Sequence, residues 1–568
     1  MQRTPVRLFC LLALTGMPQA LGDQWSEPAG FYDSVTGTGA TLKSSLASRM
    51  ALGHIQRSYG DFRFSAATFA RDPNNSSNIL LVYNRASVPA TWDSGATWNR
   101  EHVWPQSLQP GSVSNSSMGN LGDHHALRAC NPSINSSRGN KPFGLGGTVG
   151  GFGSLGTYYF PGDEDKGDIA RSLFYSDTRW GPSLGISLVN GVPGSNQMGD
   201  LASHIAWHYL DPPDEFERRR NHTIYSQAEN PAYYTNNRNA YIDRPEYIWS
   251  VYVDQANDSM LFVDSPSGDG SSSTTVSVGP ALVGAPGPIM GSMSLFRIGE
   301  DGVYYSVTTS GEAVSDDAGR HNAFPINTGG SATGTLSIGI DTATASIPGL
   351  KTGQIVIDNL DVTTGGGVDR GANDGDDIVT VELPVLDHAE ASFSGASDVN
   401  SVTIDLGAIE HLGGDGNGDV EVFNLEQTLG FTAALDVEID GGTGDTGVIT
   451  LGPSSLLSIP AGSMGAFTAT LDDATLGSFS ATYTLRVFDD QTLVGATEGA
   501  ALVVTLTGEV VAGLCPSDLN GDTIVDGADL GVLLGAWGAG PSPADLNGDG
   551  VVDGADLGLL LGSWGACE

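Results

Sequence analysis

The sequence has little cysteine, little positive charge and no long apolar segment. A membrane-spanning helix needs about 20 consecutive apolar residues, so the lack of such a run excludes a membrane span from our expectations. Lys and Arg number only 25 against 66 Asp and Glu, and the net charge of −41 argues against a strong general affinity for nucleic acid. Aromatic residues make up only 8%, whereas the 78 glycines are typical of β-rich modules with many turns.

The first 22 residues have the pattern of a secretory signal peptide. Arg3 and Arg7 accompany a short apolar stretch at 8–14, and Ala20 and Gly22 provide the small residues that a signal peptidase needs. The apolar stretch is too short for a membrane anchor. We therefore expect cleavage of 1–22 and a secreted protein that is extracellular, periplasmic or attached to the cell surface.

Three cysteines remain in the mature chain, because Cys10 lies in the signal peptide. Cys515 and Cys567 flank the C-terminal repeats, and export makes a disulfide between them the natural pairing. Cys130 is then single. It could be a nucleophile, but a small buried residue is the favoured interpretation.

A chain of 568 residues is too long for one hydrophobic core, so several domains are expected. Residues 27–262 hold most of the Trp, Tyr, His and Arg, and the Ser/Gly-rich segment 263–273 has the composition of a linker. Short alternating Val/Ile/Leu/Thr segments then predict two antiparallel β-sandwich modules, at 274–385 and 386–511. A repeat region at 515–568 ends the chain.

Positive charge is concentrated near the N-terminus. Residues 27–265 carry 18 Lys and Arg against 23 Asp and Glu, whereas residues 266–568 carry 5 against 42. We therefore expect a local positive groove in the first region and a C-terminal part that repels nucleic acid and attracts cations. Helical periodicity in the first region predicts helices near 168–175, 201–210 and 215–225.

Residues 518–538 and 545–565 are near-identical repeats, offset by 27 residues. Each spaces oxygen ligands as a calcium-binding loop does, with one backbone carbonyl among them. A leucine-striped helix follows each loop, so the region is predicted to be a small α-helical module that binds Ca²⁺. The predicted ligands are Asp518, Asn520, Asp522, Ile524 through its carbonyl, Asp526 and Asp529, and then Asp545, Asn547, Asp549, Val551 through its carbonyl, Asp553 and Asp556.

Paired loop–helix units of this kind resemble dockerin modules. The last ligand is Asp rather than the Glu of a full EF-hand, and only one helix follows each loop, as in dockerins. The resemblance implies a cohesin-like or cell-surface receptor as partner. An anchor or a stabilising cap without a partner is the alternative.

Residues 98–144 combine the side chains that hydrolysis of a phosphodiester needs. They contain several imidazoles, carboxylates, amides and arginines. A carboxylate and an amide oxygen are hard ligands that suit Mg²⁺, and an imidazole can take a proton from water near neutral pH. Adjacent residues of a regular strand face opposite sides, so Glu101 and His102 can serve one site only if a strand ends there, which Pro105 favours. Asn135 and Arg138 share one face if their segment is helical.

This region resembles the bacterial endonuclease I family of secreted or periplasmic nucleases. The similar segments are REHVWPQS at 100–107, D-x-H-x-L at 123–127 followed by N-x-x-R-G-N at 135–140, and two landmarks at 211–221 and 238–246. The resemblance implies an α+β domain with a ββα-metal site and cleavage of DNA, with RNA as a further substrate, to 5′-phosphate ends.

The same resemblance implies a role for each motif residue. His102 is the general base, Glu101 and Asn135 are the protein ligands of one Mg²⁺, and Arg138 is a phosphate or structural contact. One departure is Ala126, where the family usually has Asn.

Several alternatives remain open from the sequence. His124 and His125 are either metal ligands or a scaffold pair, and Arg218–Arg220 are either phosphate contacts or a solvated helix face. The rival function is a calcium-dependent surface or scaffold-docking protein whose nuclease domain is inactive. A second rival is a phosphodiesterase that acts on smaller esters.

Overall fold

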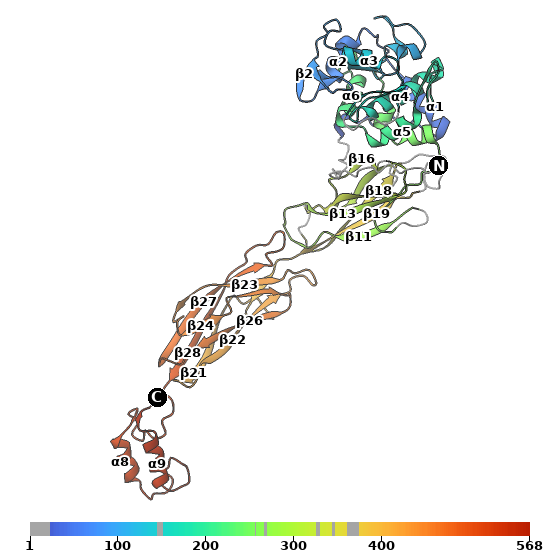
Figure 1. Cartoon of the computed structure of the whole chain (residues 1–568). Helices are drawn as coiled ribbons and strands as arrows, with labels where there is room; N and C mark the ends of the chain where they lie inside the picture. Colours follow the sequence, from blue (N-terminus) through green and yellow to red (C-terminus); the bar gives the residue numbers. More distant parts are fainter. Residues whose placement is uncertain are drawn as a thin grey trace, which may run out of the picture. The chain divides into compact units, whose positions relative to one another are not determined.

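The computed structural model describes residues 23–144, 151–255, 257–265, 270–324, 326, 330–342, 347–360 and 374–567 (Figure 1). The expected signal peptide lies outside these residues. The chain divides into two compact units. One comprises the described parts of Met1–Val278, Met290–Ile340 and Thr352–Glu382, and the other those of Gly279–Ile289, Asp341–Lys351 and Leu383–Glu568. No helix within the described ranges is long and apolar enough to cross a membrane.

The N-terminal region is built from helices with short strands between them and is therefore α+β. The helices near 168–175, 201–210 and 215–225 are confirmed as α4, α5 and α6. The elements are η1 (Asp23–Trp25), α1 (Gly39–Ala51), α2 (Phe62–Phe69), β1 (Arg71–Asp72), β2 (Asn75–Leu80), β3 (Ser87–Pro89), β4 (Asn99–His102), η2 (Gln106–Leu108), η3 (Gly119–Leu121), β5 (Leu127–Cys130), α3 (Pro132–Arg138), β6 (Gly153–Leu155), β7 (Tyr158–Phe160), α4 (Lys166–Leu184), β8 (Ser187–Leu188), β9 (Gln197–Met198), α5 (Leu201–Leu210), α6 (Glu215–Tyr225), α7 (Ala240–Asp243) and the π-helix η4 (Trp249–Val253).

Helix α4 forms the centre of the largest hydrophobic core of this region. Its residues Ile169, Leu173 and Phe174 are fully buried and share one cluster with Leu42 and Leu46 of α1. Cys130 at the end of β5 lies in the same cluster, so it is a buried core residue, as favoured from the sequence.

Strands β4 and β5 and helix α3 form a β–β–α unit on this core. The two strands pair antiparallel with Glu101 opposite Arg128 and His102 opposite Leu127. Helix α3 begins at Pro132, directly after β5 and the capping residue Asn131. The motif residues on β4 are thereby brought close to those on α3.

The first β module contains two sheets, whose strand orders are β10-β13-β17-β15 and β11-β19-β18-β14-β16, with β12 also paired to β19. Met260–Phe262 therefore belongs to a sheet rather than to the helical region. The strands are β10 (Met260–Phe262), β11 (Ser273–Ser277), β12 (Ala281–Leu282), β13 (Ile289–Ile298), β14 (Val303–Gly311), β15 (Ala313–Val314), β16 (Gly319–Phe324), β17 (Ser331–Ile340), β18 (Gly349–Asn359) and β19 (Asp377–Leu386).

The second β module is a sandwich of a four-stranded sheet, β20-β22-β26-β24, and a five-stranded sheet, β21-β28-β27-β23-β25. Buried residues of both sheets, such as Val420 and Phe467 of one and Val437 and Leu485 of the other, form one core. The strands are β20 (Glu390–Ser392), β21 (Ser401–Glu410), β22 (Gly416–Leu425), β23 (Leu435–Gly444), β24 (Ile449–Gly452), β25 (Ser455–Ile459), β26 (Met464–Leu471), β27 (Gly477–Asp489) and β28 (Leu502–Val511).

Each module departs from the purely antiparallel arrangement predicted from the sequence. Strand β11 pairs parallel with β19, and β21 pairs parallel with β28. In both cases an early strand of the module joins its last strand, and the long intervening chain permits a parallel pairing that a hairpin cannot make. The alternating polarity of the segments predicted strands correctly but carried no information on their direction.

The C-terminal region contains α8 (Gly527–Gly535), α9 (Gly554–Gly562) and the paired strands β29 (Ile524–Val525) and β30 (Gly565–Ala566). Leu533 of α8 and Leu560 of α9 are buried in one small core. The predicted disulfide between Cys515 and Cys567 is present, with a Cα–Cα distance of 5.7 Å.

Candidate active site

The four predicted site residues of the N-terminal region line one cavity of about 360 Å³. The cavity lies between the end of β4, the segment that follows it and helix α3. Its lining residues are Tyr59, Asn99, Arg100, Glu101, His102, Pro105, Gln106, Ser107, Asn135, Arg138, Gly139 and Asn140. The structure therefore brings Glu101, His102, Asn135 and Arg138 together, although Arg138 lies 36 positions after His102 in the sequence.

Local sequence explains how these side chains reach the same space. Strand β4 ends at His102, so Glu101 and His102 both line the cavity, as expected from Pro105. Asn131 caps the N-terminus of helix α3, because its side-chain oxygen accepts hydrogen bonds from the backbone N–H groups of Ser133 and Ile134. Asn135 and Arg138 then stand one helical turn apart, on the face predicted for them.

Glu101 offers one uncommitted carboxylate oxygen. The side chain is only 2% exposed. Its Oε1 accepts hydrogen bonds from the Tyr83 hydroxyl at 2.6 Å and from Nη1 of Arg138 at 3.0 Å. Burial raises the pKa of Glu101, while Arg138 and Tyr83 act in the opposite direction. Oε2 has no hydrogen-bond partner among the described residues, which leaves it available as a ligand.

Asn135 also presents an uncommitted oxygen. Its Nδ2 donates to Oδ1 of Asn99 at 2.8 Å and lies 3.4 Å from the carbonyl oxygen of Arg100. These contacts fix the orientation of the amide, because only the nitrogen end can donate. Oδ1 is not bonded to any part of the chain that the structure describes. A carboxylate oxygen and an amide oxygen in one polar cavity are a donor set that suits a hard divalent cation.

His102 is held with one ring nitrogen available as a base. Its Nε2 lies 3.0 Å from the carbonyl oxygen of Leu121. A carbonyl only accepts, so Nε2 carries the proton and Nδ1 keeps its lone pair. The ring stacks on Tyr59 with a centroid distance of 4.9 Å and an angle of 16° between the planes. The guanidinium of Arg100 lies 3.6 Å from the centroid of the same tyrosine ring.

The pKa of His102 is lowered to about 4, mainly by burial and to a smaller extent by the nearby Arg100 and Arg138, although the hydrogen bond to Leu121 acts in the opposite direction. The neutral imidazole of His102 is the form that acts as a base. We expect this form to persist until the pH falls to about 4, whereas an ordinary histidine is protonated below about 6.5. An NMR titration of the His102 ring in metal-free protein measures this directly. Arg100→Gln should move the midpoint upwards. A midpoint near the ordinary histidine value in the unmodified protein would contradict this picture of the site.

Arg138 is a structural contact in this geometry. The side chain is 1% exposed. Nη1 donates to Glu101 and to the carbonyl of His102, both at 3.0 Å, and Nη2 donates to the carbonyl of Val103 at 2.7 Å. Of the two roles implied by the family resemblance, the observed contacts support the structural one, because both terminal nitrogens are occupied by the chain.

The histidine pair next to the motif lies outside the cavity. His124 and His125 are fully buried, and Nε2 of His125 lies 3.2 Å from the carbonyl oxygen of Asn237. Burial lowers the pKa of both imidazoles to about 3. The pair therefore belongs to the scaffold, which is the second of the two alternatives left open by the sequence.

Both interpretations of Arg218–Arg220 are wrong for Arg220. This residue is 1% exposed, and its Nη2 donates to the carbonyls of His124 and Leu127, the latter at 2.8 Å. Arg219 is also largely buried and donates to the carbonyl of Arg71. These side chains satisfy backbone carbonyls of distant segments, so they are neither a solvated face nor free to contact phosphate.

The first C-terminal loop clusters carboxylate oxygens. Asp518, Asp522 and Asp529 each place one oxygen within 4.8 Å of the others. The two loops repeat the same hydrogen bonds, in which Asp518 and Asp545 each accept from three backbone N–H groups of their loop. Asp526 and Asp553 cap the helices that follow. This repeated geometry is compatible with the predicted ligand sets.

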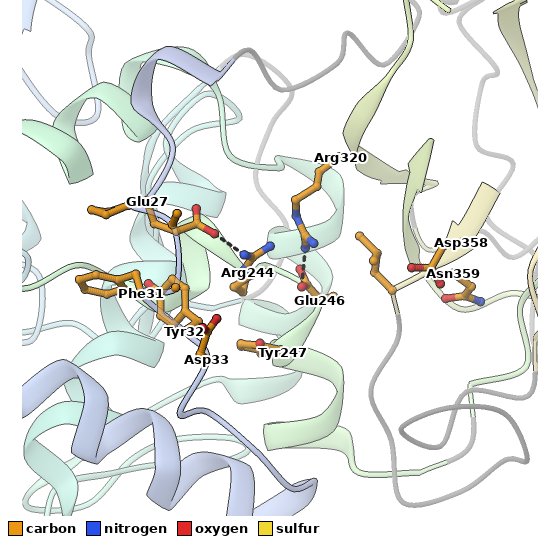
Figure 2. Close-up of a pocket in the computed structure, with 14 residues that line it drawn as sticks. Glu27, Phe31, Tyr32, Asp33, Arg244, Glu246, Tyr247, Arg320, Asp358 and Asn359 are labelled. Atoms are coloured by element: carbon orange, nitrogen blue, oxygen red, sulfur yellow. Dashed lines mark ion pairs between the residues drawn. The ribbon is translucent and has the colours of Figure 1, made fainter. Parts of the chain in front are cut away.

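A second cavity of about 410 Å³ lies in the same unit, between the N-terminal region and strands of the first β module (Figure 2). In it, Arg244 points toward Glu27 and Arg320 toward Glu246, and both pairs form ion pairs. None of its lining residues is a histidine. It therefore lacks a group that takes up protons near neutral pH, and the smaller cavity at β4 and α3 is the better candidate.

Comparison with known proteins identifies the N-terminal region. Residues 38–246 match the family model described as Endonuclease I. An extracellular ribonuclease of Bacillus amyloliquefaciens is 34% identical over 240 residues, which cover 39% of this chain and 78% of that protein. An extracellular ribonuclease of Bacillus subtilis (strain 168) is 35% identical over 235 residues, with the same coverage of 39% and 78%.

The α+β region with this site is thus a nuclease domain, and the protein is a hydrolase that acts on phosphodiester bonds. More specifically, the chain belongs to the endonuclease I family. Among solved structures, a protein of unknown function from Porphyromonas gingivalis W83 covers 40% of this chain and 94% of its own, at 14% identity and a TM-score of 0.15.

Proposed function

We propose that this protein is a secreted, Mg²⁺-dependent nuclease without strong sequence preference, in which His102 is the general base and Glu101 and Asn135 hold a single metal ion. The observation that carries the proposal is the shared cavity of these three residues. Within that cavity, Oε2 of Glu101, Oδ1 of Asn135 and Nδ1 of His102 each have no hydrogen-bond partner among the described residues. Secretion is supported by the signal-like N-terminus and by the extracellular relatives.

His102 takes a proton from a water molecule through Nδ1, while Nε2 remains bonded to Leu121 and Tyr59 keeps the ring in place. A Mg²⁺ ion, when bound, neutralises charge on the scissile phosphate and on the leaving oxygen. Arg138 keeps the carboxylate of Glu101 oriented toward the ion, and Asn135 offers its oxygen from α3.

Attack by water does not require the 2′-hydroxyl of RNA, so the same site can cut DNA and RNA. The names of the two curated relatives support RNA as a substrate. The net charge of the N-terminal region is slightly negative, with 18 Lys and Arg against 23 Asp and Glu in residues 27–265. We therefore expect binding through a local group of cationic contacts rather than a strong general affinity for nucleic acid.

Digestion of plasmid DNA and of a structured RNA by the purified mature protein tests this function. We expect cleavage with Mg²⁺, none in EDTA, and recovery when Mg²⁺ is added back. No cleavage of either polymer would favour the rival in which the domain is inactive. Rapid cleavage of a chromogenic diester without cleavage of polymers would favour a phosphodiesterase of small esters.

For the C-terminal region, we propose two Ca²⁺-binding loops in a dockerin-like module. The three clustered carboxylates and the repeated loop geometry support this. Each helix, together with the residues just after it, also exposes equivalent apolar side chains: Leu534 and Leu561 on the helices, and Trp537 and Trp564 directly after them. Such a duplicated apolar surface suits a cohesin-like receptor. Calorimetry with a purified cohesin module, in which Trp537→Ser and Trp564→Ser weaken binding, tests this partner.

Calcium should raise the melting temperature of the C-terminal module in the full chain, because an ion that binds only the folded state stabilises it. The combined variant Asp518→Ala and Asp545→Ala is expected to abolish this shift, as measured by differential scanning calorimetry. Asp398→Ala, which removes an exposed carboxylate of the second β module, is the control and should leave the shift intact. An unchanged calcium response in the combined variant would refute the assignment of the loops.

A further inference from the structure

A turn outside the sequence motifs contacts the candidate active site. Tyr83 lies in this turn with a φ of 74°, and Arg85 follows with a φ of 48°. Residues other than glycine rarely adopt this left-handed conformation, which costs about 1–2 kcal/mol for an L-residue. The conformation of Tyr83 therefore requires contacts that enforce it.

Contacts on both sides of the turn supply this constraint. The backbone N–H of Val82 donates to the carbonyl of Ala129 in β5 at 2.9 Å. The buried Asp165 accepts a hydrogen bond from the backbone N–H of Tyr83 at 2.7 Å and forms an ion pair with Arg85 at 2.9 Å. The turn is thus fixed beside β5, the partner strand of β4, which carries Glu101.

The side chain of Tyr83 is oriented as firmly as its backbone. It is 4% exposed and lies against the rings of Phe143 and Tyr159, with a centroid distance of 5.2 Å to Tyr159. Its hydroxyl is 2.6 Å from Oε1 of Glu101. A carboxylate only accepts hydrogen bonds, so the phenol is the donor.

We propose that Tyr83 is a positioning residue of the metal site, which holds Oε1 of Glu101 so that Oε2 alone faces the ion. This inference rests on the proposed function, because it assumes that Glu101 is a metal ligand. Tyr83 donates to Oε1 of Glu101 from the turn, and Arg138 donates to the same atom from α3. Together these two hydrogen bonds prevent rotation of the carboxylate. Without the hydroxyl, Glu101 can turn away from the ion or bind it through both oxygens.

The test is metal affinity in Tyr83→Phe, which keeps the ring and removes only the hydroxyl. We expect Mn²⁺ binding at the nuclease site, measured by electron paramagnetic resonance, to weaken about tenfold, as is usual when a partner of a metal ligand is lost. All variants are made in a chain that also carries Asp518→Ala and Asp545→Ala, so that the C-terminal loops do not compete for Mn²⁺. The buffer contains no EGTA. Tyr159→Phe is the matched control, because it makes the same change in a neighbouring ring whose hydroxyl has no hydrogen bond to Glu101 among the described residues. The Mn²⁺ affinity of this control should not change.

The outcomes separate this inference from the proposed function. The proposed function fails if the unmodified protein binds no Mn²⁺ at this site. It also fails if Glu101→Gln binds Mn²⁺ with the same affinity as the unmodified protein. If Glu101→Gln loses Mn²⁺ but Tyr83→Phe binds as tightly as the unmodified protein, only the role of Tyr83 is overturned. If Tyr83→Phe does not fold, genetically encoded p-aminophenylalanine at position 83 replaces it, because its amino group is still a hydrogen-bond donor. This variant should keep the Mn²⁺ affinity of the unmodified protein. Loss of Mn²⁺ affinity in the folded variant would overturn the role of Tyr83.

Discussion

Replacement of His102 by alanine is expected to lower the rate of DNA and RNA cleavage by about 10²–10⁴-fold, because the general base is removed while the metal ligands stay. The loss should appear in kcat more than in KM, since His102 acts on the attacking water rather than on the bound polymer. Steady-state cleavage of a fluorogenic oligonucleotide at saturating Mg²⁺ measures both constants.

The control is His411→Ala, which changes a histidine of the second β module that contacts the carbonyl of Ala474. It should leave cleavage unchanged. If His102→Ala retained full activity with Mg²⁺ while the control behaved as expected, a different group would have to activate the water, and His102 would be a structural residue.

Arg138→Met is expected to destabilise the nuclease domain by about 3–5 kcal/mol. The change removes the guanidinium but keeps much of the apolar stem. It leaves the buried carboxylate of Glu101 without its charged partner and leaves the carbonyls of His102 and Val103 without their donor. Urea denaturation followed by tryptophan fluorescence measures the change in the free energy of unfolding.

Lys141→Met is the matched control on the segment that follows α3. Among the described residues, its ammonium group donates to the carbonyl of Ser137 near the surface. The loss of this contact should change the free energy of unfolding by less than about 1 kcal/mol. If Arg138→Met were as stable as the unmodified protein but bound substrate more weakly, Arg138 would be a phosphate contact after all.

The predictable parts of this structure are those specified by nearby residues. Helices α5 and α6 begin after Asp200 and Asp214, which cap them, so their limits follow from the local sequence. The end of β4 follows from Pro105, and that end is what allows Glu101 and His102 to share a cavity. The disulfide between Cys515 and Cys567 follows because these cysteines flank the repeats.

The parts that could not be predicted depend on distant partners. Tyr83 lies 18 positions before Glu101, and nothing in its local sequence indicates a left-handed conformation or a contact with a carboxylate. Arg220 resembles any surface arginine of a helix until its carbonyl partners, 93 and 96 positions earlier in the chain, are known. Tyr59 likewise stacks on His102 from a separate loop.

Anomalous diffraction from crystals soaked in Mn²⁺ tests the central claim most directly, because it locates the ion relative to individual side chains. The account predicts one strong peak in the cavity between β4 and α3, bonded to Oε2 of Glu101 and Oδ1 of Asn135, with His102 on the far side of the position left for the phosphate. A peak that contacts Glu101 without Asn135, or a fully active protein whose only peaks lie outside this cavity, would contradict it.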